Sequence, residues 1–394
     1  MTSRVAWLDH DDKQRKAMLE IVDLFREKDT VDDLGYGIVR DAISDTLFPG
    51  VSVLHTRPRY MLLIGWIYAG LLDDGISGQR AIDQGRKREL ALSQALLEAG
   101  ETQGVIGRVA GKSLKRLPSA AYWAAIRTYG LLSVNSSLES YCRSIPALRQ
   151  PETVFEEGQR SQRQIWRLPP TPDGFPEEGV SLEFSTAEAH FVYERVMHAA
   201  GHSYLGLLLN HPVDEGAETP WAHPAAANAP ERIHNDLTIA EYYSLAQHGP
   251  SLLYNRLVAE VAQRDDLIED YEERLALWAD EINARFPEMQ FPLSGVWSLV
   301  DRVGARVTPG ARDFITWTLS LTPDQRSSLV HDRAAAERIA LREYTLKRAL
   351  SRLEGKRSLD SWSGSSGAGL INYRWSSVVP MVRDIVTARE GSHA

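Results

Sequence analysis

The sequence contains almost no cysteine. Cys142 is the single cysteine in 394 residues, so no disulfide can form within the chain. This excludes the small secreted folds that depend on several disulfides, and it favours a reducing compartment such as the cytoplasm. A catalytic thiol would need a base close in space. The simpler interpretation of Cys142, between Tyr141 and Arg143, is a small apolar residue of a buried core.

Long hydrophobic runs are also missing. The longest extends from Met61 to Leu72 and is interrupted only by Gly65 and Gly70. It is well short of the roughly 20 residues that a helix needs to span a bilayer. The first residues, Met-Thr-Ser-Arg-Val-Ala-Trp, turn acidic at Asp9 and show no signal-peptide pattern. We therefore expect a cytoplasmic protein that does not enter a membrane, and a buried helix at the apolar run.

The chain has no overall excess of positive charge. Its formal net charge is −9 and its pI is about 5.7, so bulk charge does not attract it to nucleic acid. Any nucleic-acid binding must come from a local basic patch. Hydrophobic residues make up 43% and charged residues 25%, the balance of an ordinary globular protein. A chain of 394 residues is long enough for two or three domains, each with its own core.

Along most of the sequence, apolar residues are spaced with the period of a helix. Near the N-terminus, for example, Met18, Ile21, Val22 and Phe25 fall on one face of a helix. Residues 51–53 are β-branched enough only for a short strand. We therefore predict an all-α, mainly helical protein with long proline-rich ordered connections and few or no short strands. The expected helices span residues 11–28, 38–47, 61–72, 79–99, 120–132, 186–209 and 237–285, with three more after residue 293.

Prolines concentrate in two stretches. Six lie between Pro146 and Pro176, and a second group surrounds Trp221. Proline fixes φ and lacks a backbone donor, so neither stretch can be a single helix or a central strand. We interpret the first as a long ordered connection. The predicted domains are an N-terminal helical bundle (1–145), this connection (146–185), a central helical region (186–292) and a C-terminal helical region with a basic helix and a Gly/Ser loop (293–394).

Two suggestive motifs fail on their spacing. The string Gly107-Arg-Val-Ala-Gly111-Lys-Ser113 resembles a P-loop, but three residues instead of four separate its glycines, and no strand precedes it. His198 and His202 lie one helical turn apart, with His190 and Glu194 in the same row, but no third metal ligand can be identified. The first is therefore not interpreted as a P-loop, and we interpret the second as a helix surface. The sequence therefore predicts no metal site and no cofactor.

Asp41 and Asp45 are the best candidates for catalysis. They lie one turn apart on a predicted helix, and paired carboxylates can hold Mg²⁺ for nuclease chemistry. They can equally form salt bridges with the nearby Arg57 and Arg59, and no further nuclease pattern accompanies them. A metal-dependent nuclease therefore stays an alternative, while the sequence favours a protein that is not an enzyme.

The most polarised segment is a predicted amphipathic helix from Ala334 to Lys356. Apolar side chains, among them Ile339, Leu346 and Leu350, share one narrow stripe, and basic side chains share the adjacent stripe. Between residues 338 and 374 there are eight basic and three acidic residues, a local excess of five positive charges. A glycine–serine loop at 361–369 follows, whose backbone amides can form an anion-binding concavity.

This combination predicts a surface that tracks phosphates, with aromatic rings available for stacking on bases. The alternative is an ordinary solvated helix face. The predicted nucleic-acid-binding residues are Arg338, Arg342, Arg348, Arg352, Lys356, Arg357, Gly364, Gly367, Tyr373, Arg374 and Trp375.

Several blocks along the chain resemble one family of bacterial proteins, a domain of unknown function. The resemblance covers nearly the whole chain. It implies membership of gene clusters that also encode helicases and phospholipase-D-like nucleases, of the kind associated with antiphage defence, and it implies no catalytic residues. The blocks are Trp7-Leu-Asp9, Leu34-Gly-Tyr-Gly-Ile-Val-Arg-Asp-Ala-Ile43 with Leu47-Phe-Pro-Gly50, Gly104-Val-Ile-Gly107 with Tyr122-Trp123, Gly249-Pro-Ser-Leu-Leu-Tyr-Asn255, and Leu359-Asp-Ser-Trp-Ser-Gly-Ser-Ser-Gly367 with Tyr373-Arg-Trp375.

The leading hypothesis is a non-catalytic accessory subunit of a bacterial antiphage defence system. It binds DNA or a partner protein through the basic C-terminal surface, and the resemblance implies a helicase or a phospholipase-D-like nuclease as partner. A third hypothesis is a pure interaction scaffold, in which the acidic face at residues 265–273 docks a basic partner.

Overall fold

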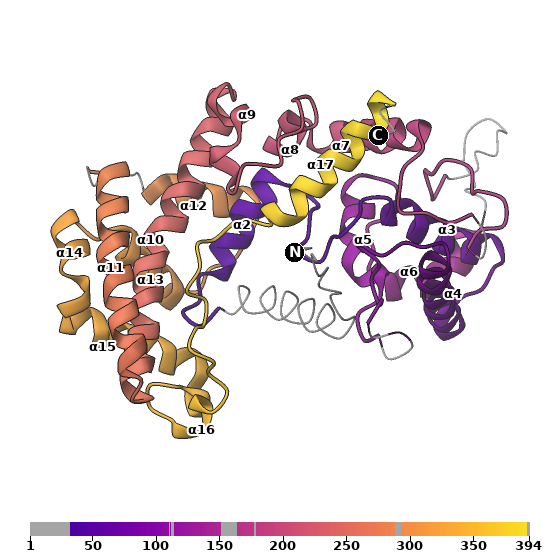
Figure 1. Ribbon diagram of the computed structural model, residues 1–394. Coiled ribbons are helices and arrows are strands. Elements are labelled where there is room, and N and C mark those ends of the chain that lie inside the picture. Colours follow the sequence, from indigo (N-terminus) through magenta and orange to yellow (C-terminus); the bar gives the residue numbers. More distant parts are fainter. Residues whose placement is uncertain are drawn as a thin grey trace, which may run out of the picture. The chain divides into compact units, whose positions relative to one another are not determined.

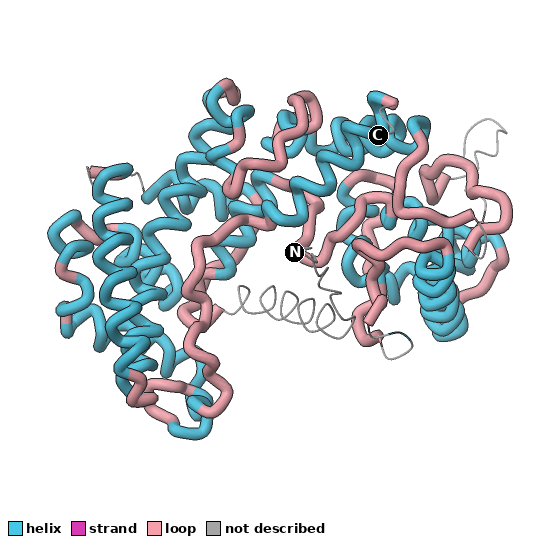
Figure 2. The backbone as a smooth tube through the Cα atoms, in the orientation of Figure 1, coloured by secondary structure: helices cyan, strands magenta, loops and turns pink. Residues whose placement is uncertain are grey.

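A computed structural model describes residues 32–109, 111, 114–150, 164–176, 179–287 and 293–391. Within these ranges the regular structure is helical and no strand forms (Figure 2). The one β-type pairing that these residues make is an isolated bridge between Leu132 and Trp166. The predicted all-α class is therefore confirmed. Residues 51–53 belong to a loop, and the helix predicted at 11–28 lies outside the described residues.

Two compact units make up the fold, and each combines two separate stretches of chain. Unit 1 contains the described residues up to Ala42 together with Thr238–Ile371. Unit 2 contains Ile43–Leu237 together with Asn372–Ala394. The sequence pattern predicted contiguous domains instead, because a linear pattern carries no information about which distant segments pack together.

The chain passes between the units inside two helices and once after Ile371. The first helix is α2 (Gly37–Leu47) and the second is α10 (Glu231–Val261). α10 contains Pro250 in its interior and still continues, although proline removes one helical hydrogen bond. Domain boundaries usually fall in exposed linkers, so boundaries inside helices leave no compositional signal in the sequence.

Unit 2 is built around α3 (Tyr60–Asp73), the apolar run that the sequence predicts as a buried helix. Every residue from Tyr60 to Tyr68 is buried, so this helix has no polar face. Helices α4 and α5 pack against α3, α6 packs against α4, and α7 packs against α17. The other elements of unit 2 are α4 (Gly78–Glu98), α5 (Pro118–Thr128), α6 (Leu138–Leu148), α7 (Thr186–Ala200), α8 (Tyr204–Leu208), the 3₁₀ turn η2 (Pro220–Ala222), α9 (Pro224–Ala227) and α17 (Trp375–Glu390) (Figure 1).

The described part of the first proline-rich stretch is an ordered connection. The indole N–H of Trp66 on α3 donates to the carbonyl of Pro169 at 2.9 Å. The ring of Phe175 meets the same indole edge to face, with centroids 5.4 Å apart. Leu168 packs where a Cβ on Gly65 would lie, at 2.8 Å. Side chains from α3 therefore hold this segment, which has no regular structure of its own.

In unit 1 the start of the described chain packs against helices from its last third. Tyr36 is buried against the rings of Tyr243 and Phe314. Its hydroxyl forms a hydrogen bond of 2.9 Å with Thr318, and its carbonyl accepts the hydroxyl of Tyr243 at 2.9 Å. The remaining elements of unit 1 are α11 (Asp265–Arg285), α12 (Leu293–Arg302), α13 (Pro309–Leu319), α14 (Pro323–Ser327), η3 (Leu329–His331), α15 (Arg333–Lys347), η4 (Arg348–Leu350) and α16 (Lys356–Leu359) (Figure 1).

The predicted helix from Ala334 to Lys356 is wrong beyond residue 347. Asp332 caps α15 by accepting the backbone N–H groups of Ala334 and Ala335, and the helix ends at Lys347. The 3₁₀ turn η4 follows, and the chain then reverses direction. The apolar and basic stripes predicted along residues 338–356 required one continuous helix, so they do not form as predicted.

The glycine–serine loop continues into a segment that we call the strap (residues 364–371). The strap has no regular structure, yet its backbone carbonyls accept hydrogen bonds from side chains of α10 and α11. The predicted anion-binding concavity is not formed at Ser366, because its amide donates to the side chain of Asn255 at 2.8 Å. The carbonyl pairs are Gly364 with Tyr271, Ser366 with Asn255, Ala368 with His248 and Arg274, and Ile371 with Ser244.

Among the described residues, no helix is both long and apolar enough to cross a membrane.

Candidate functional site

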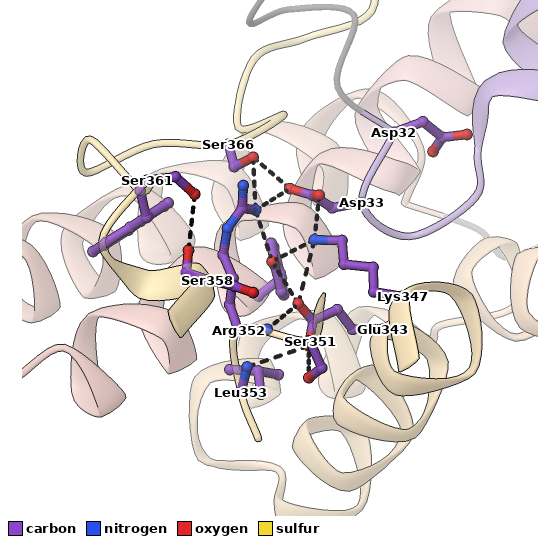
Figure 3. A network of polar contacts seen from close by, with 12 residues as sticks. Asp32, Asp33, Glu343, Lys347, Ser351, Arg352, Leu353, Ser358, Ser361 and Ser366 are labelled. Carbon is purple, nitrogen blue, oxygen red and sulfur yellow. Dashed lines mark hydrogen bonds and ion pairs between the residues drawn. The ribbon is translucent and has the colours of Figure 1, made fainter. Parts of the chain in front are cut away.

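The chain reversal after α15 is organised by one buried carboxylate. Glu343 has no exposed surface. It accepts the hydroxyl of Ser351 at 2.5 Å, the backbone N–H of Arg352 at 2.8 Å and the N–H of Leu353 at 3.3 Å (Figure 3). Because these donors come from the segment that follows η4, Glu343 folds that segment back onto its own helix.

The reversal places the backbone of Arg348 in a conformation that residues other than glycine rarely adopt. Its backbone angles are φ 52° and ψ −122°. Such a conformation costs of the order of 1–3 kcal/mol and persists only where the surrounding structure enforces it. Here the enforcing structure is the Glu343 cluster, which holds the chain immediately after Arg348. Strained residues of this kind concentrate at functional sites.

A second buried carboxylate joins the start of the described chain to the same cluster. Asp33 forms ion pairs with Lys347 and with Arg352, the latter at 2.9 Å, and it accepts the hydroxyl of Ser366 (Figure 3). Burial alone would raise the pKa of Asp33. The hydrogen bonds from Lys347 and Ser366 and the charges of Lys347 and Arg352 outweigh it, so the pKa lies below its usual value.

Tyr254 lies at the centre of the cluster. Its hydroxyl donates to Glu343 at 3.0 Å and accepts from Lys347 at 3.0 Å and Arg352 at 3.1 Å. Burial raises the pKa of Tyr254 far above its usual value, so the phenol stays protonated. Two carboxylates therefore meet two cations, and each charge has several partners. Through these contacts the cluster joins α10, α15 and the segment after η4.

An exposed apolar surface is the result. We define the ridge as Leu341, Tyr344, Arg348 and Leu350, which are all exposed. Leu341 is 66% exposed and Leu350 is 71% exposed. The Arg348 guanidinium lies 5.9 Å from the ring centre of Tyr344, and no described residue forms an ion pair with it. The ridge therefore presents leucines, one aromatic ring and one cation that forms no ion pair within the described part of the chain.

Most cations of the predicted nucleic-acid surface have partners inside the protein. Arg342 is buried and donates to the carbonyl of Leu34 at 2.9 Å, and Arg352 belongs to the Asp33 cluster. Arg338 is partly exposed, but it pairs with Asp313 at 2.5 Å and lies over the ring of Trp317. Arg348 is exposed. The side chains of Lys356 and Arg357 lie outside the described residues.

The rest of the predicted surface is divided between the units. Gly364 and Gly367 belong to the strap in unit 1, where both have positive φ. Tyr373, Arg374 and Trp375 belong to unit 2. The two rings are almost completely buried, and the indole of Trp375 donates to the carbonyl of Ala217. They are therefore not available for stacking on bases, because neighbouring side chains already cover them.

The alternative catalytic residues are used in salt bridges or lie apart. Asp45 pairs with Arg374 at 2.6 Å, and Asp41 pairs with Arg40 at 3.1 Å. Arg57 and Arg59 form ion pairs with other acids, Asp384 and Glu188. Among the described residues, no group of three or more His, Cys, Asp and Glu side chains is placed to hold a metal ion.

The other singled-out motifs keep their simpler interpretations as far as they are described. His190, Glu194 and His198 lie on an exposed face of α7, and His202 is exposed in the turn that follows the helix. Gly107 and Gly111 both have positive φ in a loop after α4, where no strand precedes them. Cys142 is buried, and burial raises the pKa of its thiol to about 11. The acidic residues around 265–273 line the exposed side of α11.

Sequence reasoning missed the residues that organise the site. Asp33, Tyr254 and Glu343 stand in three segments separated by more than 80 residues, so no local pattern links them. One signal was present. Glu343 is one of the three acidic residues among the cations of residues 338–374, and an acid in that position indicates internal pairing with the cations around it.

The fold and the cluster together define an all-α protein with a buried ionic core and an exposed apolar ridge. Over residues 2–388 the chain matches the family described as "Family of unknown function (DUF6361)". The chain therefore belongs to this family, which agrees with the resemblance to a domain of unknown function. No curated protein and no solved structure matches the chain.

Proposed function

We propose that this chain is a non-catalytic binding subunit that docks a partner protein through the ridge. The observation that carries the proposal is the strained backbone of Arg348 beside exposed Leu341 and Leu350. A protein that only needed a stable helix end would gain stability by relaxing Arg348 and covering the leucines. Strain and apolar exposure at the same place are therefore the expected marks of a binding surface.

The chemistry of the ridge favours a protein partner over DNA. Leucine side chains gain nothing from a phosphate backbone, whereas they bury well in an apolar groove. Tyrosine and arginine are the residue types that most often dominate protein interfaces. The partner should therefore offer an apolar groove for Leu341, Tyr344 and Leu350 and a carboxylate for Arg348. Charge complementarity of this kind gives the interface its orientation.

The resemblance to gene clusters of the antiphage-defence type suggests which proteins to test. In this proposal the chain is a cytoplasmic accessory subunit of a bacterial defence system. Its partner is a helicase or a phospholipase-D-like nuclease encoded beside it, which supplies the catalytic activity. The division of labour is consistent with the neutral, fully paired cluster around Tyr254, which contains no group free for catalysis.

The test is a direct binding measurement with each neighbouring protein, purified one at a time. We expect one of them to bind the wild-type chain, and the double variant Leu341→Asp/Leu350→Asp to lose at least about 30-fold in affinity, the size of an interface hot spot. Calorimetry or surface plasmon resonance gives the dissociation constants.

Leu277→Asp is the matched control, because Leu277 is 62% exposed on α11 of the same unit. This variant should bind like the wild type. If none of the neighbouring proteins binds, or if Leu277→Asp weakens binding as much as the ridge variant does, the proposal is wrong. An unchanged melting temperature of the ridge variant shows that lost binding is not lost folding.

A further inference from the structure

A group of basic side chains in unit 2 forms no ion pair with the carboxylates of the described residues. We define the basic face as Arg86 and Lys87 on α4 with Arg108, Lys115 and Arg116 on the loop that joins α4 to α5. All except Arg108 are exposed, and Arg108 is half-buried. This loop contains the glycine block that was first considered as a P-loop.

The contacts in this region place the five residues close together. The Arg86 guanidinium donates to the carbonyl of Leu114 at 3.1 Å, which brings α4 to the residue preceding Lys115. The side chain of Leu114 in turn packs beside Gly107, only 2.8 Å from the place that a Cβ on Gly107 would occupy. Gly107 directly precedes Arg108. Arg86 therefore contacts Leu114, and the other four basic residues are close in sequence to Arg86, Leu114 or Gly107.

The nearby acids are engaged elsewhere. Asp83, one turn before Arg86, accepts the amide of Gln79 at 3.0 Å. Glu89 is completely buried and accepts the hydroxyl of Tyr68 and the N–H of Ser119. No ion pair joins any residue of the basic face to a described carboxylate. By contrast, the adjacent Arg88 pairs with Asp74 at 2.7 Å.

The arrangement fits an extended polyanion better than a single phosphate. A phosphate pocket uses the free N–H groups at a helix N-terminus. The first turn of α5, which begins after Arg116, is instead occupied by the Glu89 carboxylate on the N–H of Ser119. Only side-chain cations remain, and they are distributed over a face. Such cations bind successive phosphates of a nucleic-acid backbone without reading the sequence.

We propose that the basic face of unit 2 binds the phosphate backbone of a nucleic acid. This goes beyond the partner docking proposed for unit 1 and uses different residues. The chain as a whole carries a net charge of −9, so binding depends on this local excess of cations and must be strongly salt-dependent. With four or five phosphate contacts, affinity falls roughly 100- to 500-fold between 50 and 200 mM salt.

The experiment measures binding of the full chain to fluorescent 20-base duplex DNA, single-stranded DNA and RNA across a salt series. The double variant Lys115→Glu/Arg116→Glu should lower the slope of log affinity against log salt by about 2. Its control is Arg143→Glu/Arg333→Glu, which changes the net charge equally. Both of these arginines are exposed and paired with a glutamate on their own helix, and this variant should keep the wild-type slope.

Three outcomes would overturn the proposal. The first is wild-type protein that shows no salt-dependent binding to any of the three nucleic acids. The second is an equal loss of affinity in the two double variants, which would indicate bulk charge alone. The third is equally tight binding of poly-glutamate, which would indicate an acidic protein as the natural partner. Ridge variants should bind nucleic acid normally, so failure here and failure of the ridge proposal are distinguishable.

Discussion

At the residue scale, two buried glutamates show how environment decides charge. Burial raises the pKa of Glu89, because its hydrogen bonds to Ser119 and Tyr68 do not outweigh the loss of water. Burial acts on Glu343 in the same direction, but the hydroxyl of Ser351, the amides of Arg352 and Leu353 and the charge of Lys347 lower its pKa below the usual value. Its environment thus makes the protonated form of glutamate easier to reach in unit 2 and the charged form easier to reach in unit 1.

The first prediction concerns Glu89. The relevant pH range lies between the pKa of Glu89 in the unfolded chain and its raised pKa in the folded protein. In this range the folded protein binds more protons than the unfolded chain, so the free energy of unfolding falls as pH rises. Glu89→Gln removes this titration. Relative to the wild type it should become more stable with increasing pH, by about 1.4 kcal/mol for each pKa unit of the shift.

Denaturant unfolding at pH 5 and pH 8 measures the difference. Glu98→Gln is the control for the loss of one carboxylate, because Glu98 is an exposed residue of the same helix, α4. Identical pH dependence for Glu89→Gln and the wild type would refute the raised pKa.

At the element scale, α15 shows where sequence patterns succeed and where they stop. The helical period correctly predicts that a helix begins near Ala334, and Asp332 is a good N-cap residue. The period could not predict the end at Lys347, because no glycine or proline marks it. The stop comes from Glu343, which draws in Ser351, Arg352 and Leu353 from the following segment. A helix end imposed by tertiary contacts leaves little trace in local sequence.

The second prediction tests this helix end. Arg348→Gly should stabilise the protein by about 1 kcal/mol, because glycine adopts positive φ without strain, while its greater freedom in the unfolded chain offsets part of the gain. The same variant should weaken partner binding, since the guanidinium is lost.

Thermal or denaturant unfolding checks the stability of this variant. For comparison, Arg143→Gly lies within α6, where glycine should destabilise the protein by about 1 kcal/mol. Loss of stability in both variants would show that Arg348 is not strained.

At the scale of the whole molecule, the fold class could be predicted from the composition and from the helical spacing of apolar residues. Which segments combine into each unit could not be predicted. The all-α class and the buried helix at α3 needed only local patterns. The pairing of Asp33 and Tyr36 with residues near 243, 314 and 347 joins positions that are about 200 to 300 residues apart. The candidate site depends on these long-range pairs. For this reason the sequence identified the segment that carries the ridge but assigned its arginines to the wrong environment.

The third prediction follows from the composition of the units. Tyr36→Ala removes a buried ring and its hydrogen bond to Thr318, which should cost about 3–5 kcal/mol. The loss should appear in unit 1, although Tyr36 lies near the start of the chain. Hydrogen exchange should accelerate in α13 and α15, whereas exchange in α4 and α6 of unit 2 should stay at the wild-type rate. Acceleration confined to residues near 36 would argue against this assignment.

The strap has a consequence for what variation the chain can accept. The carbonyls of residues 371, 368 and 366 form hydrogen bonds with Ser244, His248 and Asn255, respectively. The strap therefore runs antiparallel to α10. Surface loops ordinarily accommodate added or deleted residues at little cost. Here a rigid helix fixes the spacing of the hydrogen-bond partners. Inserting or deleting one residue between Gly364 and Ile371 would therefore misalign every carbonyl beyond that point with its partner on α10. This loop should therefore keep a constant length even where its residues change.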